Sequence, residues 1–139
     1  MRKRVLTSAI SFILICSLFT SFALAATLRA SEYISAYNAV IYSSGNEITV
    51  DCSITGTGRM KTLGIKSVKI YSSNGTNVAT YSYTADGYEY LMGSDTGRKT
   101  ASVTYTGTSG KSYYAVVVFY ASDGSGGDSR SYTTKTITV

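Results

Sequence analysis

The sequence predicts an all-β domain: an immunoglobulin- or fibronectin-like antiparallel β-sandwich of about seven strands that follows a cleaved signal peptide. Apolar and polar residues alternate at every second position in several segments, as in strands with one buried face. Turn signals rich in Gly, Asn and Ser separate these segments at steady spacing. No segment carries a helical period of useful length. A small barrel is the alternative fold.

The N-terminus has the pattern of a secretory signal peptide. Three basic residues at positions 2–4 precede an apolar run over residues 5–22, which ends in Ala23-Leu24-Ala25. An uncleaved membrane anchor is the alternative, because the run approaches the length that spans a bilayer. The Ala-x-Ala ending favours cleavage. We therefore expect residues 1–25 to be removed and residues 26–139 to be secreted as one domain, without membrane association.

Charge and cysteine content limit the possible functions of the secreted part. Three of the 13 basic residues lie in the signal peptide and all 8 acidic residues lie beyond it, which leaves a net charge of +2. No basic cluster remains, so the sequence argues against nucleic-acid binding. Cys16 leaves with the signal peptide, so Cys52 has no partner for an intramolecular disulfide.

The first three predicted strands cover residues 33–42, 47–54 and 65–71. The second has the clearest alternation, because Ile48, Val50, Cys52 and Ile54 share one face. The sequence TGTGRMKTLG at positions 55–64 is predicted to be a loop that tucks Met60 and Leu63 under the sheets. Val68 and Ile70 are predicted to point inward from the third strand.

The remaining strands follow turns of recognisable chemistry. Asn74-Gly75 suits a two-residue hairpin turn, which leads into a fourth strand over residues 78–83. Further strands are predicted at residues 99–105, 112–123 and 129–139. Tyr113 enters the sixth strand after a Gly-containing corner, the place of a tyrosine corner in such sandwiches.

Residues 85–98, ADGYEYLMGSDTGR, fit no strand cleanly and make a long connection for a compact domain. They contain too many apolar side chains to be simply solvated. We expect the segment to cap an open edge of the sandwich, since uncovered edge strands invite aggregation. A binding loop is the alternative.

The sixth strand is apolar on both faces. Tyr113, Ala115, Val117 and Phe119 are predicted to face the core, so the intervening residues should face outward. Tyrosine offers rigid, amphipathic contact area, and exposed aromatic surfaces often mark partner sites. The predicted binding surface consists of Tyr71, Tyr114, Val116, Val118, Tyr120 and Tyr132. The alternative is that these side chains only stabilise the sheet through cross-strand pairs.

The sequence gives little support for catalysis or metal binding, so we predict no catalytic residue, no metal site and no cofactor. Cys52 has no histidine to activate it and lies on the apolar side of its strand. The carboxylates in turns and loops (Asp86, Glu89, Asp95, Asp123 and Asp128) are of the kind that is normally solvated. Asp123, Ser125 and Asp128 share a Gly-rich loop but do not match the spacing of an EF-hand calcium loop.

Three loose motifs give the chain a resemblance to known sequences. They are Tyr-Ile-Ser-x-Tyr at residues 33–37, the Thr-Gly to Gly-Ile stretch at residues 57–65, and Gly-x-x-Tyr-x-Ala-x-Val at residues 110–117. With them, the chain resembles a family of small secreted proteins of unknown function from anaerobic Gram-positive, clostridia-like bacteria. The resemblance implies bacterial export and a single sandwich domain, and it implies no activity.

These observations predict an exported, non-catalytic module that binds an extracellular protein or carbohydrate through its Tyr-rich sheet face. One alternative is a self-associating structural protein, a homo-oligomer whose apolar strip is covered by a second copy. In that case the terminal strand at residues 134–139 could also be exchanged between copies. A second alternative is a small secreted hydrolase, which would need a carboxylate pair that the sequence does not reveal.

Overall fold

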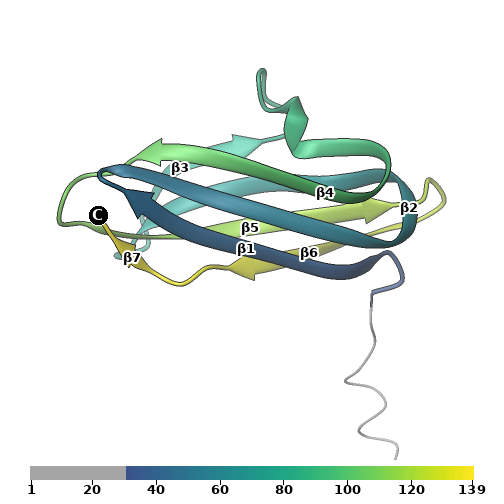
Figure 1. Cartoon of the computed structure of the whole chain (residues 1–139), viewed down its shortest axis with the longest axis horizontal. Helices are drawn as coiled ribbons and strands as arrows, with labels where there is room; N and C mark the ends of the chain where they lie inside the picture. The colour runs from purple at the N-terminus through teal and green to yellow at the C-terminus, as the bar shows by residue number, and fades with distance from the viewer. Residues whose placement is uncertain (1–30) are drawn as a thin grey trace, which may run out of the picture. The chain divides into compact units, whose positions relative to one another are not determined.

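The computed structural model describes residues 31–139, which form one compact unit. The predicted signal peptide lies outside the described residues. Every strand pairing in the unit is antiparallel (Figure 1). The elements are β1 (Ile34–Ser44), β2 (Glu47–Ser72), β3 (Asn77–Ser82), the 3-10 turn η1 (Glu89–Leu91), β4 (Met92–Thr106), β5 (Ser112–Ser122), β6 (Gly127–Thr133) and β7 (Ile137–Thr138). Within residues 31–139, no helix has the length and apolar character needed to cross a membrane.

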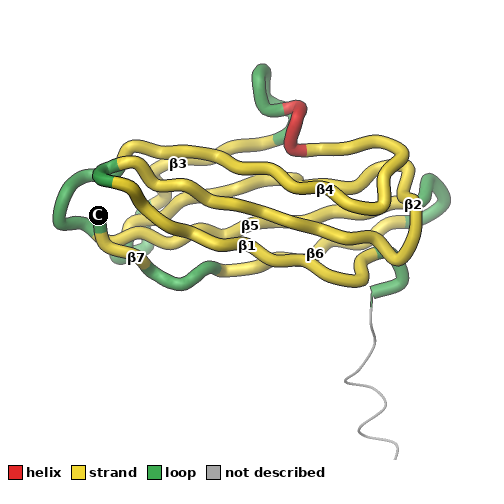
Figure 2. The backbone as a smooth tube through the Cα atoms, viewed as in Figure 1, coloured by secondary structure: helices red, strands yellow, loops and turns green. Residues whose placement is uncertain are grey.

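The seven strands belong to one sheet that curls into two facing layers. The long strand β2 takes part in both layers and so joins them. Residues 47–55 of β2 pair with β1 on one side and with the C-terminal part of β4 on the other. Residues 62–72 pair with β5, which pairs in turn with β6 and β7, and β3 flanks β2 on the side opposite β5. Strands make up most of the described trace, and the loop before η1 projects from the side of the sheet (Figure 2). The predicted all-β, antiparallel, sandwich-like fold is confirmed.

The prediction of a loop at residues 55–64 is wrong, because β2 runs through this stretch as one strand of 26 residues. The N-terminal half of β4 pairs along it, with a register shift between Thr55 and Met60. Gly64 allows the backbone at Leu91 to approach the strand closely, because a Cβ on Gly64 would lie 2.4 Å from the carbonyl oxygen of Leu91. Met60 and Leu63 are buried, as predicted.

The face assignment of β5 is confirmed. Its buried side chains alternate with half-buried ones along the whole strand. The buried set joins the hydrophobic core between the layers, and Phe119 is its largest fully buried member. Tyr113 behaves as the predicted tyrosine corner, because its hydroxyl accepts a hydrogen bond of 2.8 Å from the Thr108 N–H. This bond ties the entry of β5 to the turn after β4.

Residues 85–98 differ in part from the prediction, because β4 already begins at Met92 and pairs with residues 60–64 of β2. The remaining residues, 85–91, cover an edge of the sheet, as expected. The Tyr90 hydroxyl donates to the Ser102 carbonyl (2.8 Å), and Tyr81 of β3 donates to the Thr104 carbonyl (2.7 Å). Carbonyls two residues apart point to the same side of a strand, so the two tyrosines occupy one edge of β4.

The predicted last strand, residues 129–139, is interrupted. β6 ends at Thr133, and β7 pairs with β5 only at Ile137 and Thr138. Thr134 causes the break by bonding Ala115 twice: its N–H donates to the Ala115 carbonyl, and its hydroxyl accepts from the Ala115 N–H, both at 2.9 Å. A side-chain oxygen thus replaces a ladder carbonyl at this point.

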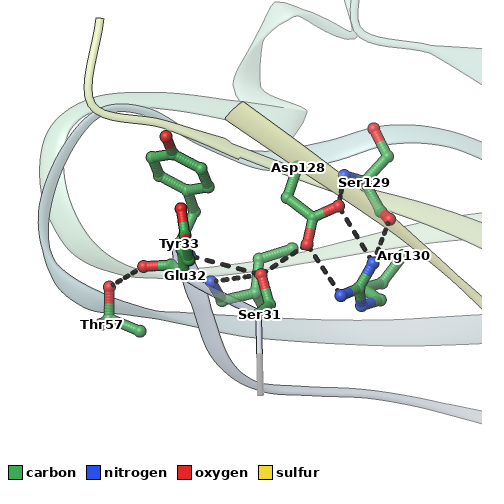
Figure 3. A network of polar contacts seen from close by, with 8 residues as sticks. Ser31, Glu32, Tyr33, Thr57, Asp128, Ser129 and Arg130 are labelled. Carbon is green, nitrogen blue, oxygen red and sulfur yellow. Dashed lines mark hydrogen bonds and ion pairs between the residues drawn. The ribbon is translucent and has the colours of Figure 1, made fainter. Parts of the chain in front are cut away.

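The chain enters β1 through a polar network (Figure 3). The Ser31 hydroxyl donates to Asp128 on β6 (2.5 Å) and accepts from the Ile34 N–H (3.0 Å). Asp128 also forms an ion pair of 2.9 Å with Arg130. The Thr57 hydroxyl donates to the backbone carbonyl of Glu32 (2.7 Å), so the start of the domain is held to both β2 and β6.

Candidate functional site

A continuous strip of aromatic and aliphatic side chains lies on the outer face of the layer formed by β2, β5 and β6. It comes from alternate positions of β5 and from the opposite position of β2. Its members are all half-buried, and they are Tyr71, Tyr114, Val116, Val118 and Tyr120. We call this set the outer strip. It spans seven residues of β5, from Tyr114 to Tyr120, and the six steps between them cover about 20 Å at about 3.3 Å per step.

Tyrosines form both ends of the outer strip. Tyr71 and Tyr114 are direct cross-strand partners, and their rings stack with centroids 5.3 Å apart and an interplanar angle of 12°. At the other end, Lys66 Nζ lies 6.0 Å from the ring centroid of Tyr120. This is the range of a weak cation–π contact. The strip therefore offers two flat aromatic ends joined by two valines.

The surroundings of the outer strip are cationic and hydroxylated. Lys66 and Lys69 of β2 are exposed beside it, and Lys69 is the cross-strand partner of Val116. On the β6 side, the partners of Val116, Val118 and Tyr120 are small exposed hydroxyl residues, Thr133, Ser131 and Ser129. No carboxylate faces outward from β5, β6 or residues 66–72 of β2, because Asp128 pairs with the inward-facing Ala121.

The placement of Tyr132 in this surface is wrong. Tyr132 is the cross-strand partner of Val117, whose side chain is fully buried, so Tyr132 projects to the inner side of the sheet. There it meets Tyr37 of β1 edge-to-face, with centroids 6.4 Å apart. The structure thus brings together five of the six predicted residues. It adds Lys66 and Lys69, which were not among the predicted site residues.

A second surface, which the sequence analysis missed, lies on the outer face of the β1–β2–β4 layer. It is a shallow pocket of about 480 Å³ whose polar lining comes from Asn38, Asp51, Ser53, Thr100 and Ser102. The Ser102 hydroxyl donates to Asp51, and hydrogen bonding to the same carboxylate raises the pKa of Tyr42. The polar residues that alternate along residues 47–54, which include Asp51 and Ser53, could have indicated this surface from the sequence. Asp51 is occupied by these neighbours, so the pocket is a poorer candidate than the outer strip.

Cys52 is a buried apolar residue, as predicted. Only 4% of its surface is exposed, and its cross-strand neighbours are Ala39 and Ala101. Burial, with a smaller contribution from the charge of Asp51, raises the pKa of the thiol to about 12. A thiol that stays protonated at neutral pH is a poor nucleophile.

The Gly-rich loop between β5 and β6 satisfies its own polar groups. The Asp123 carboxylate accepts from the N–H of Gly126 (3.0 Å) and from the N–H and hydroxyl of Ser125 (both 2.8 Å). These bonds, that of Gly126 first, lower the pKa of Asp123. Asp128 is bonded to Ser31 and Arg130, as described above. No group of three or more potential metal-ligating side chains occurs among residues 31–139.

No protein-family model and no curated protein matches this chain. We therefore infer its function from the surfaces described above.

Proposed function

We propose that the protein is an exported, non-catalytic binding module whose outer strip holds an extracellular carbohydrate polymer that carries anionic groups. The observation that carries the proposal is the stacked Tyr71–Tyr114 pair at one end of an apolar strip flanked by two lysines. Flat aromatic rings suit the apolar faces of sugars, and tyrosine hydroxyls can hydrogen-bond to their polar rims.

The charge around the strip supports an anionic ligand. Lys66 and Lys69 stand beside it without an outward-facing carboxylate on the neighbouring segments of β2, β5 and β6. Such a one-signed surface attracts anions and repels cations. The length of the strip, about 20 Å, suits several units of an extended polymer better than a small molecule.

The strand order and the Tyr113 corner support assigning the domain to the immunoglobulin-like sandwiches. The predicted signal peptide supports export, and the sequence resemblance described above supports a Gram-positive bacterial source. Under this proposal the ligand lies outside the cell, on the producer's own wall or on a host surface.

Self-association through the strip is the main competing function. In a two-fold symmetric contact, equivalent patches face each other. Such a contact would bring Lys66 and Lys69 of both copies into one interface to which the outer strip contributes no carboxylate, and like charges gathered in an interface are unfavourable. The strip therefore favours an anionic ligand over a second copy.

The proposal is tested by co-sedimentation of residues 26–139 with Gram-positive cell walls and, separately, with mucin. Tyr114→Ala/Tyr120→Ala removes both ends of the strip on β5. Tyr42→Ala is the matched control, because Tyr42 is 45% exposed on the opposite layer. We expect the wild type and the control to pellet with one material and the folded double variant to stay in solution. Equal retention of all three proteins, or no retention of any, would contradict the proposal.

A further inference from the structure

The outer edge of β1 is a long, regular and unpaired strand edge. β1 pairs with β2 on one side only, and its register is regular from Ala36 to Ser44. Apart from the bond between the Ile34 N–H and Ser31, no segment of residues 31–139 other than β2 hydrogen-bonds to the backbone of β1. Its sequence, ISAYNAVIYSS, contains no charged residue and no proline. These are the features that natural edge strands normally avoid.

The edges of β4, β3 and β6 are protected. Tyr81 and Tyr90 occupy the carbonyls on the edge of β4. β3 is only six residues long, with a register shift at its end. β6 carries the ion pair between Asp128 and Arg130. Because the edges of β4, β3 and β6 carry such devices, the open edge of β1 is a distinguishing feature rather than a general property of the fold.

A pocket of about 300 Å³ lies directly beside this edge. It runs between residues 38–41 of β1 and the segment from Tyr132 to Lys135. Buried Ala39 and Ile41 give it apolar walls, and Tyr132 closes one side. Lys135 contributes a cation that is exposed and forms no ion pair within the part of the chain that the structure describes.

We propose that the edge of β1 receives an extended peptide strand of another protein, with an apolar side chain in this pocket and a carboxylate beside Lys135. The added strand would extend the β4–β2–β1 layer by main-chain hydrogen bonds, while the pocket and Lys135 would select its side chains. This site goes beyond the proposed function, because it lies on another part of the molecule and takes a peptide rather than a glycan.

The charge of the site decides between a foreign strand and a second copy. Antiparallel pairing of two β1 edges would bring two uncharged strands together, so neither copy would supply a carboxylate to Lys135. If the pairing were centred near residues 38–41, it would also place the two lysines near the two-fold axis. A strand with an acidic residue satisfies the cation, and a second β1 does not.

The proposal is tested by titrating peptides into residues 26–139 and recording the amide resonances of the protein by NMR. The probes are acetyl-Thr-Val-Glu-Val-Thr-Val-amide, the same peptide with Lys in place of Glu, and the same acidic peptide with Pro in place of the central Val. At millimolar concentration, we expect the acidic peptide to shift the β1 amide resonances and to slow their hydrogen exchange. The Pro peptide should not, because it lacks a ladder N–H.

The variant Lys135→Glu tests the charge requirement without touching β1. We expect it to weaken binding of the acidic peptide and to strengthen binding of the basic one, each by about two- to fivefold, the range for one exposed charge pair. Shifts confined to the outer strip, or no shift with any peptide, would overturn the proposal. Protection of the β1 amides that grows with protein concentration alone would also overturn it, since the occupant would then be a second copy. The peptide titration does not depend on retention by a glycan. The proposal for the β1 edge and the proposal for the outer strip can therefore be refuted independently.

Discussion

Tyr71 and Tyr114 face each other across β2 and β5, with their rings stacked 5.3 Å apart on the outer surface of the sheet. Both rings are half-buried. The pair is therefore able to stabilise the sheet and to offer a flat aromatic surface to a ligand. The two roles are separable by experiment, because stability is measured without ligand.

The first prediction concerns the structural share of this pair. Tyr71→Ala and Tyr114→Ala should each lower the free energy of unfolding, and the double variant should lose less than the sum. We expect a coupling free energy of about 0.5–1 kcal/mol, as for aromatic cross-strand pairs. Urea denaturation of the four proteins in the cycle measures it. Strict additivity would mean that the stacking contributes nothing to stability.

The second prediction concerns the edge of β4. Tyr81→Phe/Tyr90→Phe removes two hydroxyl donors and leaves the carbonyls of Ser102 and Thr104 open at the strand edge. We expect a loss of about 0.5–1.5 kcal/mol in unfolding free energy for each hydrogen bond. Fibril formation should also become faster, because a free edge templates strand addition. Thioflavin T kinetics check this, with Tyr120→Phe as the control.

An unchanged lag time in the double Tyr→Phe variant would show that the hydroxyls do not protect this edge. The control should behave as the wild type, since Tyr120 lies on β5, which is paired there with both β2 and β6.

The third prediction concerns the close contact at Gly64. Gly64→Ala places a Cβ 2.4 Å from the Leu91 carbonyl oxygen and 2.8 Å from the Met92 Cα, both of which are backbone atoms. We expect a loss of about 1–3 kcal/mol in unfolding free energy. Gly58→Ala is the matched control on the same strand, because nothing lies within 4 Å of its added Cβ. Equal thermal midpoints for the two variants would contradict the close packing of η1 against β2.

The fourth prediction concerns the pH dependence that Cys52 imposes. The folded pKa of about 12 exceeds the ordinary value of 9.0, mainly because the thiol is buried. Below pH 9.0 both states hold the proton, so the contribution to stability is complete there. As pH rises further, only the unfolded chain loses the proton, and stability falls.

Between pH 8 and pH 10, the wild type should therefore lose about 1 kcal/mol more unfolding free energy than Cys52→Ala. The alanine variant carries the same tyrosines and lysines, so it corrects for their titration. Urea denaturation at the two pH values gives the comparison. The same pH dependence in both proteins would show that the thiol is not shielded from water.

Local patterns predicted the faces of the regular strands well. The alternation in β5 placed Tyr113, Ala115, Val117 and Phe119 inside without knowledge of the neighbouring strands. The Tyr113 corner was equally local, since its partner Thr108 lies only five residues away. Such signals need no information from distant parts of the chain.

The errors arose where pairing is non-local. Residues 55–64 and 92–98 each resemble loops on their own, because both are rich in glycine and polar residues. They become strands by pairing with each other. The orientation of Tyr132 was also undetermined, because the Thr-rich stretch around it alternates equally well in either phase. Its register is set by the loop at residues 123–126 and by pairing with β5.

Hydroxyl-radical footprinting of the tyrosines tests whether the outer strip is the ligand surface. The measurement compares residues 26–139 free and bound to whichever polymer retains them. We expect binding to slow the oxidation of Tyr71, Tyr114 and Tyr120, while the exposed Tyr42 and Tyr90 react at unchanged rates. Slower oxidation of Tyr42 or Tyr90, with the outer strip unaffected, would contradict it.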